Sequence, residues 1–163
     1  MDDYCLLLDY SPKHLLDMMY EEASRSENYY LSPVNVLRCD VSKSLRTELT
    51  KIINVPFADC GFLKTAPMQT YPVHIDKFRI SAINMPLFED VEGFESFVIT
   101  GKGIESINYK RNQFTLLNVM KPHGVENKNL EKERIILSIG VKNNPYDELI
   151  LMHKKGTLIN AIL

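Results

Sequence analysis

The sequence has few cysteines, and their spacing is not that of a disulfide framework or a metal-binding motif. It contains three cysteines in 163 residues, at Cys5, Cys39 and Cys60. An odd number without C-x-x-C spacing argues against both a disulfide framework and a zinc knuckle. We interpret them as free thiols that pack like small hydrophobic side chains.

Long apolar runs are also absent. No stretch of eighteen or more apolar residues occurs, so no segment has the length of a transmembrane helix. The first residues, Met1–Tyr4, are acidic where a secretory signal would be basic, and only Cys5–Leu8 is apolar before Asp9. We therefore expect a cytoplasmic protein with no membrane partner.

The sequence also lacks an excess of positive charge. The 19 Lys and Arg residues against 21 Asp and Glu give a formal net charge of −2. Such a chain has no general attraction to polyphosphate, so nucleic acid is a less favoured partner than protein or small molecules. The length is that of a single domain, which we assign to residues 1–163.

Residues 1–58 are predicted to form a helical N-terminal brace. After a short strand over residues 4–10, Ser11-Pro12 is typical of a helix start, and apolar side chains continue a helical face to about Ala23. Residues 24–40 have the composition of a loop. A second helix, capped by Ser42 or Ser44, is expected to end before Val55-Pro56.

Residues 59–163 have the pattern of a β-rich core, with short apolar or alternating runs separated by turn residues. The runs are 61–64, 70–75, 78–87, 94–100, 104–109, 114–118, 134–141, 148–152 and 157–162. Many short strands at this spacing predict an antiparallel sandwich or barrel, and a double-sheet jelly roll fits best.

Three residues in this core have the chemistry of a metal site. His74 and Asp76 are two positions apart, so in an extended segment their side chains point to the same face. A third ligand is available in His123, which precedes the apolar run Arg134–Val141. Two histidines and one carboxylate form the facial triad of non-haem Fe(II) oxygenases, which leaves three positions of an octahedral ion open.

The pattern resembles the Fe(II)/2-oxoglutarate-dependent dioxygenases. Its parts are the H-x-D of His74 and Asp76, the distal His123, and the cation Arg134 eleven positions later. Tyr71, three residues before the first histidine, is similar to the Y-x-x-H-x-D of the prolyl-hydroxylase-like branch. The resemblance covers about residues 59–142. It implies an α+β, mainly β fold: a double-stranded β-helix (jelly roll) core with supporting N-terminal helices.

The resemblance also implies the roles of the residues. His74, Asp76 and His123 would hold Fe(II), to which the cosubstrate 2-oxoglutarate binds through its 1-carboxylate and keto oxygen. Arg134 would receive the distal carboxylate through two parallel charge-assisted hydrogen bonds. Dioxygen is the further reactant, and succinate and CO2 are released as a C–H bond is hydroxylated.

Three further residues are weaker candidates for the cosubstrate pocket. Tyr71 would lie near the same carboxylate as Arg134, or else serve as a half-buried aromatic. Asn84 and Asn118, polar residues in apolar runs, either contact the cosubstrate or a metal ligand, or bond to the backbone of a neighbouring strand.

Two other function classes stay open at this point. One is a cupin-like metal enzyme that does not use 2-oxoglutarate, and the other is a non-catalytic jelly-roll binding domain. A buried Arg134 would favour the oxygenase, because only a dicarboxylate cosubstrate needs a cation opposite the metal. The sequence favours a peptidyl or small-molecule substrate but identifies neither it nor the oligomeric state.

Overall fold

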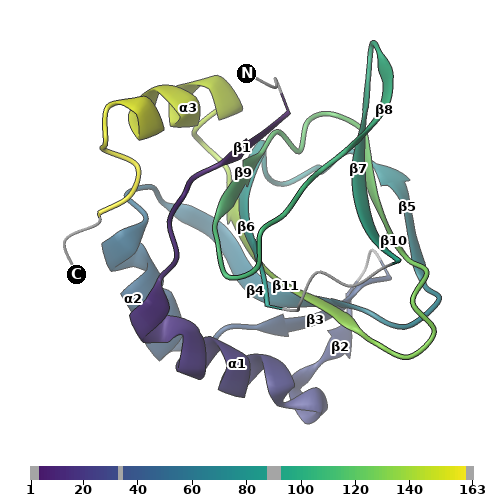
Figure 1. The fold of residues 1–163 in the computed structure, drawn as a ribbon. Coiled ribbons are helices and arrows are strands. Elements are labelled where there is room, and N and C mark those ends of the chain that lie inside the picture. Colours follow the sequence, from purple (N-terminus) through teal and green to yellow (C-terminus); the bar gives the residue numbers. More distant parts are fainter. Residues whose placement is uncertain (1–3, 33–34, 88–92, 161–163) are drawn as a thin grey trace.

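The computed structural model describes residues 4–32, 35–87 and 93–160, which form a mainly β chain with few helices (Figure 1). The strands are β1 (Cys5–Leu7), β2 (Tyr30–Leu31), β3 (Leu37–Asp40), β4 (Phe57–Thr65), β5 (Thr70–His74), β6 (Ser81–Pro86), β7 (Phe94–Thr100), β8 (Gly103–Ser106), β9 (Thr115–Leu117), β10 (His123–Asn127) and β11 (Arg134–Val141). The helices are α1 (Leu16–Ser24), α2 (Lys43–Ile52) and α3 (Tyr146–Lys154), with short 3-10 turns η1 (Lys13–Leu15) and η2 (Ser26–Asn28).

The strands form two sheets, and each pair of neighbouring strands is antiparallel, as the sequence predicts. The large sheet has seven strands in the order β1-β9-β6-β11-β4-β3-β2. The small sheet has four, in the order β5-β10-β7-β8. Figure 1 shows the helices on one side of the large sheet and the small sheet on the other.

The outer face of the large sheet carries the main hydrophobic core. Alternate residues of β11, including Leu137 and Ile139, are fully buried there. Helix α2 contributes Leu45, Leu49 and Ile52, whose spacing of four and three residues forms one apolar stripe. As predicted, Ser42 caps this helix, with its hydroxyl accepting a hydrogen bond from the Leu45 N–H at 3.1 Å.

The inner face of the large sheet, toward the small sheet, is far more polar. Asn84 on β6 lies opposite Ser138 on β11, and Arg134 begins the latter strand; all three are buried. A smaller apolar cluster, which includes Val98 and Leu117, accompanies them. Buried polar groups are costly unless they are paired, and each of these three is hydrogen-bonded to another side chain.

The small sheet brings together the two predicted histidine ligands. His74 ends β5, His123 begins β10, and the antiparallel register sets them directly opposite each other. On its other side His123 lies opposite Val98 of β7. Residues 49 positions apart in sequence thus become cross-strand neighbours.

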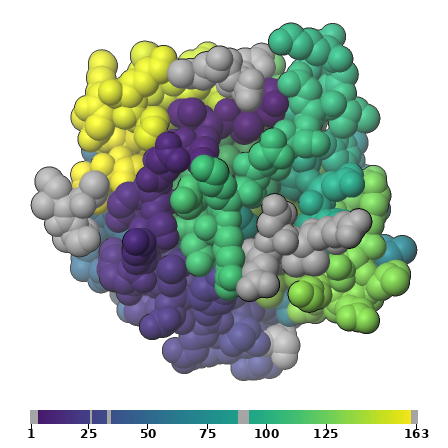
Figure 2. All heavy atoms as spheres, viewed as in Figure 1, coloured from purple at the N-terminus to yellow at the C-terminus, as the bar shows by residue number. Residues whose placement is uncertain are grey.

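The N-terminal segment closes one side of the molecule. Figure 2 shows it in purple against green residues that follow β8. Leu8 and Phe114 are joined by a backbone hydrogen bond of 2.9 Å, and residues 4–7 line a cavity together with Ser106 and Asn108.

The predicted strand over residues 148–152 is wrong. This apolar run belongs to helix α3, in which Tyr146, Leu149 and Ile150 are buried at helical spacing. Acidic Asp147 and Glu148 in the first turn and basic residues in the last complement the helix dipole. In the predicted strand over 157–162, the described part contains only an isolated bridge between Ile159 and Ile53, and residues 161–162 lie outside the described residues.

The N-terminal brace is also more than helical. The short strand predicted over residues 4–10 is confirmed as β1, which joins the large sheet. Strands β2 and β3 also belong to this sheet, so the interpretation of residues 24–40 as a loop is wrong. The shortness of β2 and β3 hides the alternating pattern. Strand β10 is missed for another reason, because its sequence, His-Gly-Val-Glu-Asn, has little apolar character.

Within the described ranges, no helix has the length and apolar character needed to cross a membrane.

We expect the core of the large sheet to dominate folding stability. Leu137 is fully buried in β11, so Leu137→Ala should lower the free energy of unfolding by about 2–5 kcal/mol in chemical denaturation. Leu130→Ala is the matched control, because Leu130 is 77% exposed and the same truncation there should cost well under 1 kcal/mol. Equal losses would show that the core has been wrongly located.

Candidate metal centre

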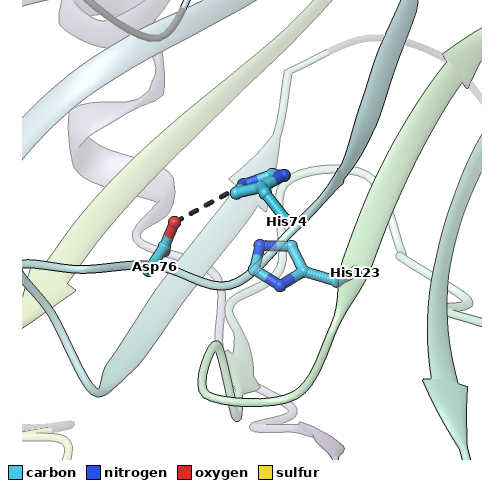
Figure 3. A group of neighbouring side chains, drawn as sticks. All are labelled: His74, Asp76 and His123. Carbon is cyan, nitrogen blue, oxygen red and sulfur yellow. Dashed lines mark ion pairs between the residues drawn. The ribbon is translucent and has the colours of Figure 1, made fainter.

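The side chains of His74 and His123 face each other between the ends of β5 and β10 (Figure 3). Their ring centroids are 4.3 Å apart, with the ring planes inclined at 53°. Both side chains are partly buried, which leaves one side of the pair accessible.

Backbone carbonyls orient both imidazoles. His74 Nδ1 lies 2.9 Å from the carbonyl oxygen of Pro72, and His123 Nδ1 lies 2.9 Å from that of Lys121. A ring nitrogen that faces a carbonyl must carry the proton, so in the neutral rings Nε2 retains its lone pair. This is the arrangement of metal-binding histidines, whose other nitrogen donates to a carbonyl or carboxylate.

Asp76 completes the group from the loop after β5. Its backbone N–H donates to the carbonyl of Val119 at 3.2 Å, which ties this loop to the chain that leads into β10. Its Oδ1 lies 3.4 Å from His74 Nε2, and its Oδ2 accepts a hydrogen bond of 2.5 Å from Arg79 Nε.

The carboxylate is ionised at neutral pH. Burial acts to raise the pKa of Asp76, but the hydrogen bond from the protonated form of His74 and the charge and hydrogen bond of Arg79 outweigh it and lower the pKa to about 2. Asp76 therefore offers a negative oxygen ligand over the whole physiological range.

The three residues together fit a divalent transition metal. One donor atom from each of His74, Asp76 and His123 lies within 4.8 Å of the others, the one such group found in the described part of the chain. Neighbouring ligands on an octahedral ion with bonds of about 2.1 Å lie about 3 Å apart, close to the His74–Asp76 separation of 3.4 Å. Two imidazoles and one carboxylate suit Fe(II) and leave positions open.

Tyr71 lies against the metal centre. Its ring packs edge-on to His74 at a centroid distance of 4.7 Å and an interplanar angle of 80°. Burial raises the pKa of its hydroxyl. The contact supports one face of the His74 ring, as the alternative of a half-buried aromatic predicts. A contact of Tyr71 with the cosubstrate stays a prediction.

Arg134 is deeply buried between the sheets, with 3% of its surface exposed. Its guanidinium donates to the hydroxyl of Ser96 at 2.5 Å and lies 5.6 Å from the centre of the Tyr109 ring. Burial lowers the pKa of Arg134, and Tyr109 opposes this effect. An arginine remains protonated nonetheless, so the interior holds a positive charge.

The position of Arg134 relative to the metal centre follows from the register. Val98 lies opposite His123, and Ser96 is two residues along the same strand, a spacing of about 7 Å. The partner of the guanidinium thus lies on β7, two positions from the residue opposite His123.

A cavity of about 250 Å³ opens beside this arginine. Besides Arg134 its lining includes Ser96, Tyr109, Arg111 and Glu95, the last of which pairs with Lys128 at 3.1 Å. The residues that line this cavity include Arg134 but none of His74, Asp76 and His123.

Asn84 lies in the interior next to these groups. Its amide donates to the Tyr109 hydroxyl at 3.1 Å, while its buried Oδ1 has no hydrogen-bond partner among the described residues. Tyr109, the aromatic beside Arg134, could not be singled out from the sequence, because nothing there distinguishes it from the other tyrosines.

Asn118 lies elsewhere. Its side-chain oxygen accepts a hydrogen bond of 3.2 Å from the Met120 N–H, and it lines a separate cavity of about 280 Å³ with Tyr146 and Asp147. It shapes the turn before His123. Its contact with a cosubstrate stays a prediction.

We expect the two histidines to titrate on opposite sides of the ordinary pKa of 6.5. The hydrogen bond to Asp76 raises the pKa of His74, and burial lowers that of His123. His74 therefore stabilises the fold below pH 6.5, and this stabilisation is lost as the pH rises through its higher folded-state pKa. NMR titration of the metal-free protein measures both values.

Asp76→Asn provides the internal test of that assignment. Without the carboxylate the pKa of His74 should fall well below its value in the unchanged protein. If the two histidines titrate together and Asp76→Asn moves neither, Asp76 does not interact with His74 in solution.

Comparison with known proteins gives no match to any protein family or curated protein at the level of sequence. Solved structures with the same fold are found. A Pseudomonas putida prolyl-4-hydroxylase is 15% identical with a TM-score of 0.61, over 86% of this chain and 92% of that one. A 2OG-Fe(II) oxygenase family oxidoreductase from Burkholderia pseudomallei is 11% identical with a TM-score of 0.62, over 80% and 83% of the two chains.

A third similar structure is HygX from Streptomyces hygroscopicus, with nickel, 2-oxoglutarate and hygromycin B bound. It is 10% identical with a TM-score of 0.56, over 87% of this chain and 84% of that one. The chain thus shares the fold of 2-oxoglutarate–Fe(II) oxygenases and gathers a His-Asp-His group within it.

Proposed function

We propose that the protein is an Fe(II)- and 2-oxoglutarate-dependent oxygenase with a double-stranded β-helix core. The observation that carries the proposal is the convergence of His74, Asp76 and His123 on one point, with Arg134 buried between the same two sheets. Two histidines and a carboxylate occur with many metals, but a buried cation beside an open metal site suits a dicarboxylate cosubstrate.

In this proposal, Nε2 of His74, Nε2 of His123 and a carboxylate oxygen of Asp76 hold the iron. The carbonyls of Pro72 and Lys121 keep the imidazoles in the metal-binding tautomer, and Tyr71 packs against the His74 ring. When bound, Fe(II) and 2-oxoglutarate supply oxidative decarboxylation, with one atom of dioxygen entering succinate and the other the substrate C–H bond.

Arg134 would bind the distal carboxylate of 2-oxoglutarate and so fix the direction in which the molecule enters. Ser96 and Tyr109 hold the guanidinium from two sides, which limits its rotamers before the ligand arrives. Asn84 would add a polar contact at the same end through the second N–H of its amide, because the first goes to Tyr109. A preorganised charge in a buried pocket binds a carboxylate more strongly than one that must be ordered first.

For the substrate we propose a peptidyl or small-molecule C–H bond, hydroxylated with dioxygen as co-reactant. The support is the similarity in fold to a prolyl-4-hydroxylase on one hand, and to HygX with bound hygromycin B on the other. The net charge of −2 makes nucleic acid the less favoured partner.

We predict that the purified protein with Fe(II), ascorbate and 2-oxoglutarate releases succinate, at least in slow uncoupled turnover. His74→Ala should abolish this release, because it removes one of three protein ligands. His153→Ala is the matched control, since His153 lies on α3 outside the ligand group, and should match the unchanged protein. Succinate measured by mass spectrometry at equal levels in both variants would rule out the proposed site.

Arg134→Ala separates this proposal from a metal enzyme that does not use 2-oxoglutarate. Loss of a buried partner for the distal carboxylate should weaken 2-oxoglutarate binding about a hundredfold or more, on the order of 3–5 kcal/mol. Iron affinity measured without cosubstrate should stay nearly constant. Asp76→Ala, in contrast, should weaken both.

Arg25→Ala provides the control for loss of an arginine, because Arg25 is half-exposed on the surface beside Glu21. It should leave 2-oxoglutarate binding unchanged in calorimetric titration. If Arg134→Ala also stays within about threefold of the unchanged protein, under roughly 1 kcal/mol, the assignment of 2-oxoglutarate loses its main support.

A further inference from the structure

Arg79 makes the closest contact to a predicted metal ligand from outside the triad. Its Nε donates to Asp76 Oδ2 at 2.5 Å, and one terminal nitrogen donates to the hydroxyl of Ser138 at 2.8 Å. The side chain is only 15% exposed. Arg79 thus bridges the loop that carries Asp76 and the central strand of the large sheet.

The backbone of β11 leaves room for this arginine. A Cβ atom at Gly140 would lie 2.8 Å from Cδ of Arg79 and 2.1 Å from Oδ1 of Asp59. A Cβ atom essentially never makes contacts this short, so a larger residue at position 140 would displace one or both side chains. The glycine thus makes room for the carboxylate of Asp59 first and for Arg79 beside it.

A second arginine continues the arrangement away from the metal centre. The other side of Asp59 accepts a hydrogen bond from Arg38 at 3.3 Å, and Arg79 lies 3.7 Å from Oδ1 of the same carboxylate. Arg38 also bonds to Asp40 at 2.7 Å. Positive and negative side chains thus alternate along the inner face of the large sheet. Arg79 pairs with Asp76 on one side and with Asp59, which does not belong to the triad, on the other.

We infer that Arg79 is a positioning residue that makes Asp76 a monodentate ligand. Its hydrogen bond takes Oδ2, so that Oδ1, the oxygen facing His74, is the atom left for the ion. A carboxylate with both oxygens available can occupy two positions on a metal. Engaging one of them keeps three positions of an octahedral ion open, as a reaction with a chelating cosubstrate and dioxygen requires.

The inference rests on the proposed metal site, and Co(II) provides a probe that needs no turnover. Arg79→Gln should weaken Co(II) binding about tenfold to a hundredfold, the range for loss of an outer hydrogen bond to a ligand. It should also change the visible d–d absorption of the bound ion, because Asp76 becomes free to rotate or to bind through both oxygens. Arg79→Lys, which retains the charge, should recover part of the affinity.

Arg38→Gln is the matched control. Arg38 is equally buried, at 16% side-chain exposure, and shares Asp59 with Arg79, but it does not contact Asp76. Its loss should lower thermal stability as much as loss of Arg79 while leaving the Co(II) affinity and spectrum unchanged. Identical Co(II) spectra and affinities for Arg79→Gln and the unchanged protein would overturn the inference.

Gly140→Ala tests the same claim without altering a charge. The added methyl group would push against both Asp59 and Arg79, and by moving Arg79 away from Asp76 it should reproduce the spectral change of Arg79→Gln. A folded Gly140→Ala protein with the unchanged Co(II) spectrum would contradict the inference. Failure of the unchanged protein to bind Co(II) at all would instead refute the metal site itself, so the two ideas fail in distinguishable ways.

Discussion

The pairing of β5 with β10 is the interaction on which the site depends. It sets His74 opposite His123 and so joins two ligands from distant parts of the sequence. Beyond the two strands, the hydrogen bond from the Asp76 N–H to the Val119 carbonyl joins the loop after β5 to the segment before β10. A shift of one residue in this register would turn one histidine to the opposite face of the sheet and separate the ligands.

The large sheet serves two purposes with its two faces. The apolar outer face packs against the helices and holds the larger of the two hydrophobic clusters. This leaves the inner face free to hold groups that would be costly in a core, such as Arg134, Asn84 and Arg79. Each is hydrogen-bonded to a neighbouring side chain, which offsets part of the cost of burial.

The sequence predicts the residues of the site better than their surroundings. His74, Asp76 and His123 can be found because their chemistry and order are distinctive, and the antiparallel architecture follows from the short apolar runs. The role of Arg79 could not be predicted, since it depends on space left by Gly140, sixty-one residues away in sequence. Strand β10 and helix α3 were misjudged because sheet register and helix packing override local apolar pattern. The single-domain assignment and the cytoplasmic location stay predictions.

The central claim is that one divalent ion is held by these three residues. Crystals grown anaerobically with Mn(II) in place of Fe(II) test it most directly, through anomalous scattering near the manganese absorption edge. The account predicts a single strong peak bonded to Nε2 of His74, Nε2 of His123 and one oxygen of Asp76, at about 2.1–2.3 Å. A peak at another site, or none between the histidines at saturating Mn(II), would contradict it.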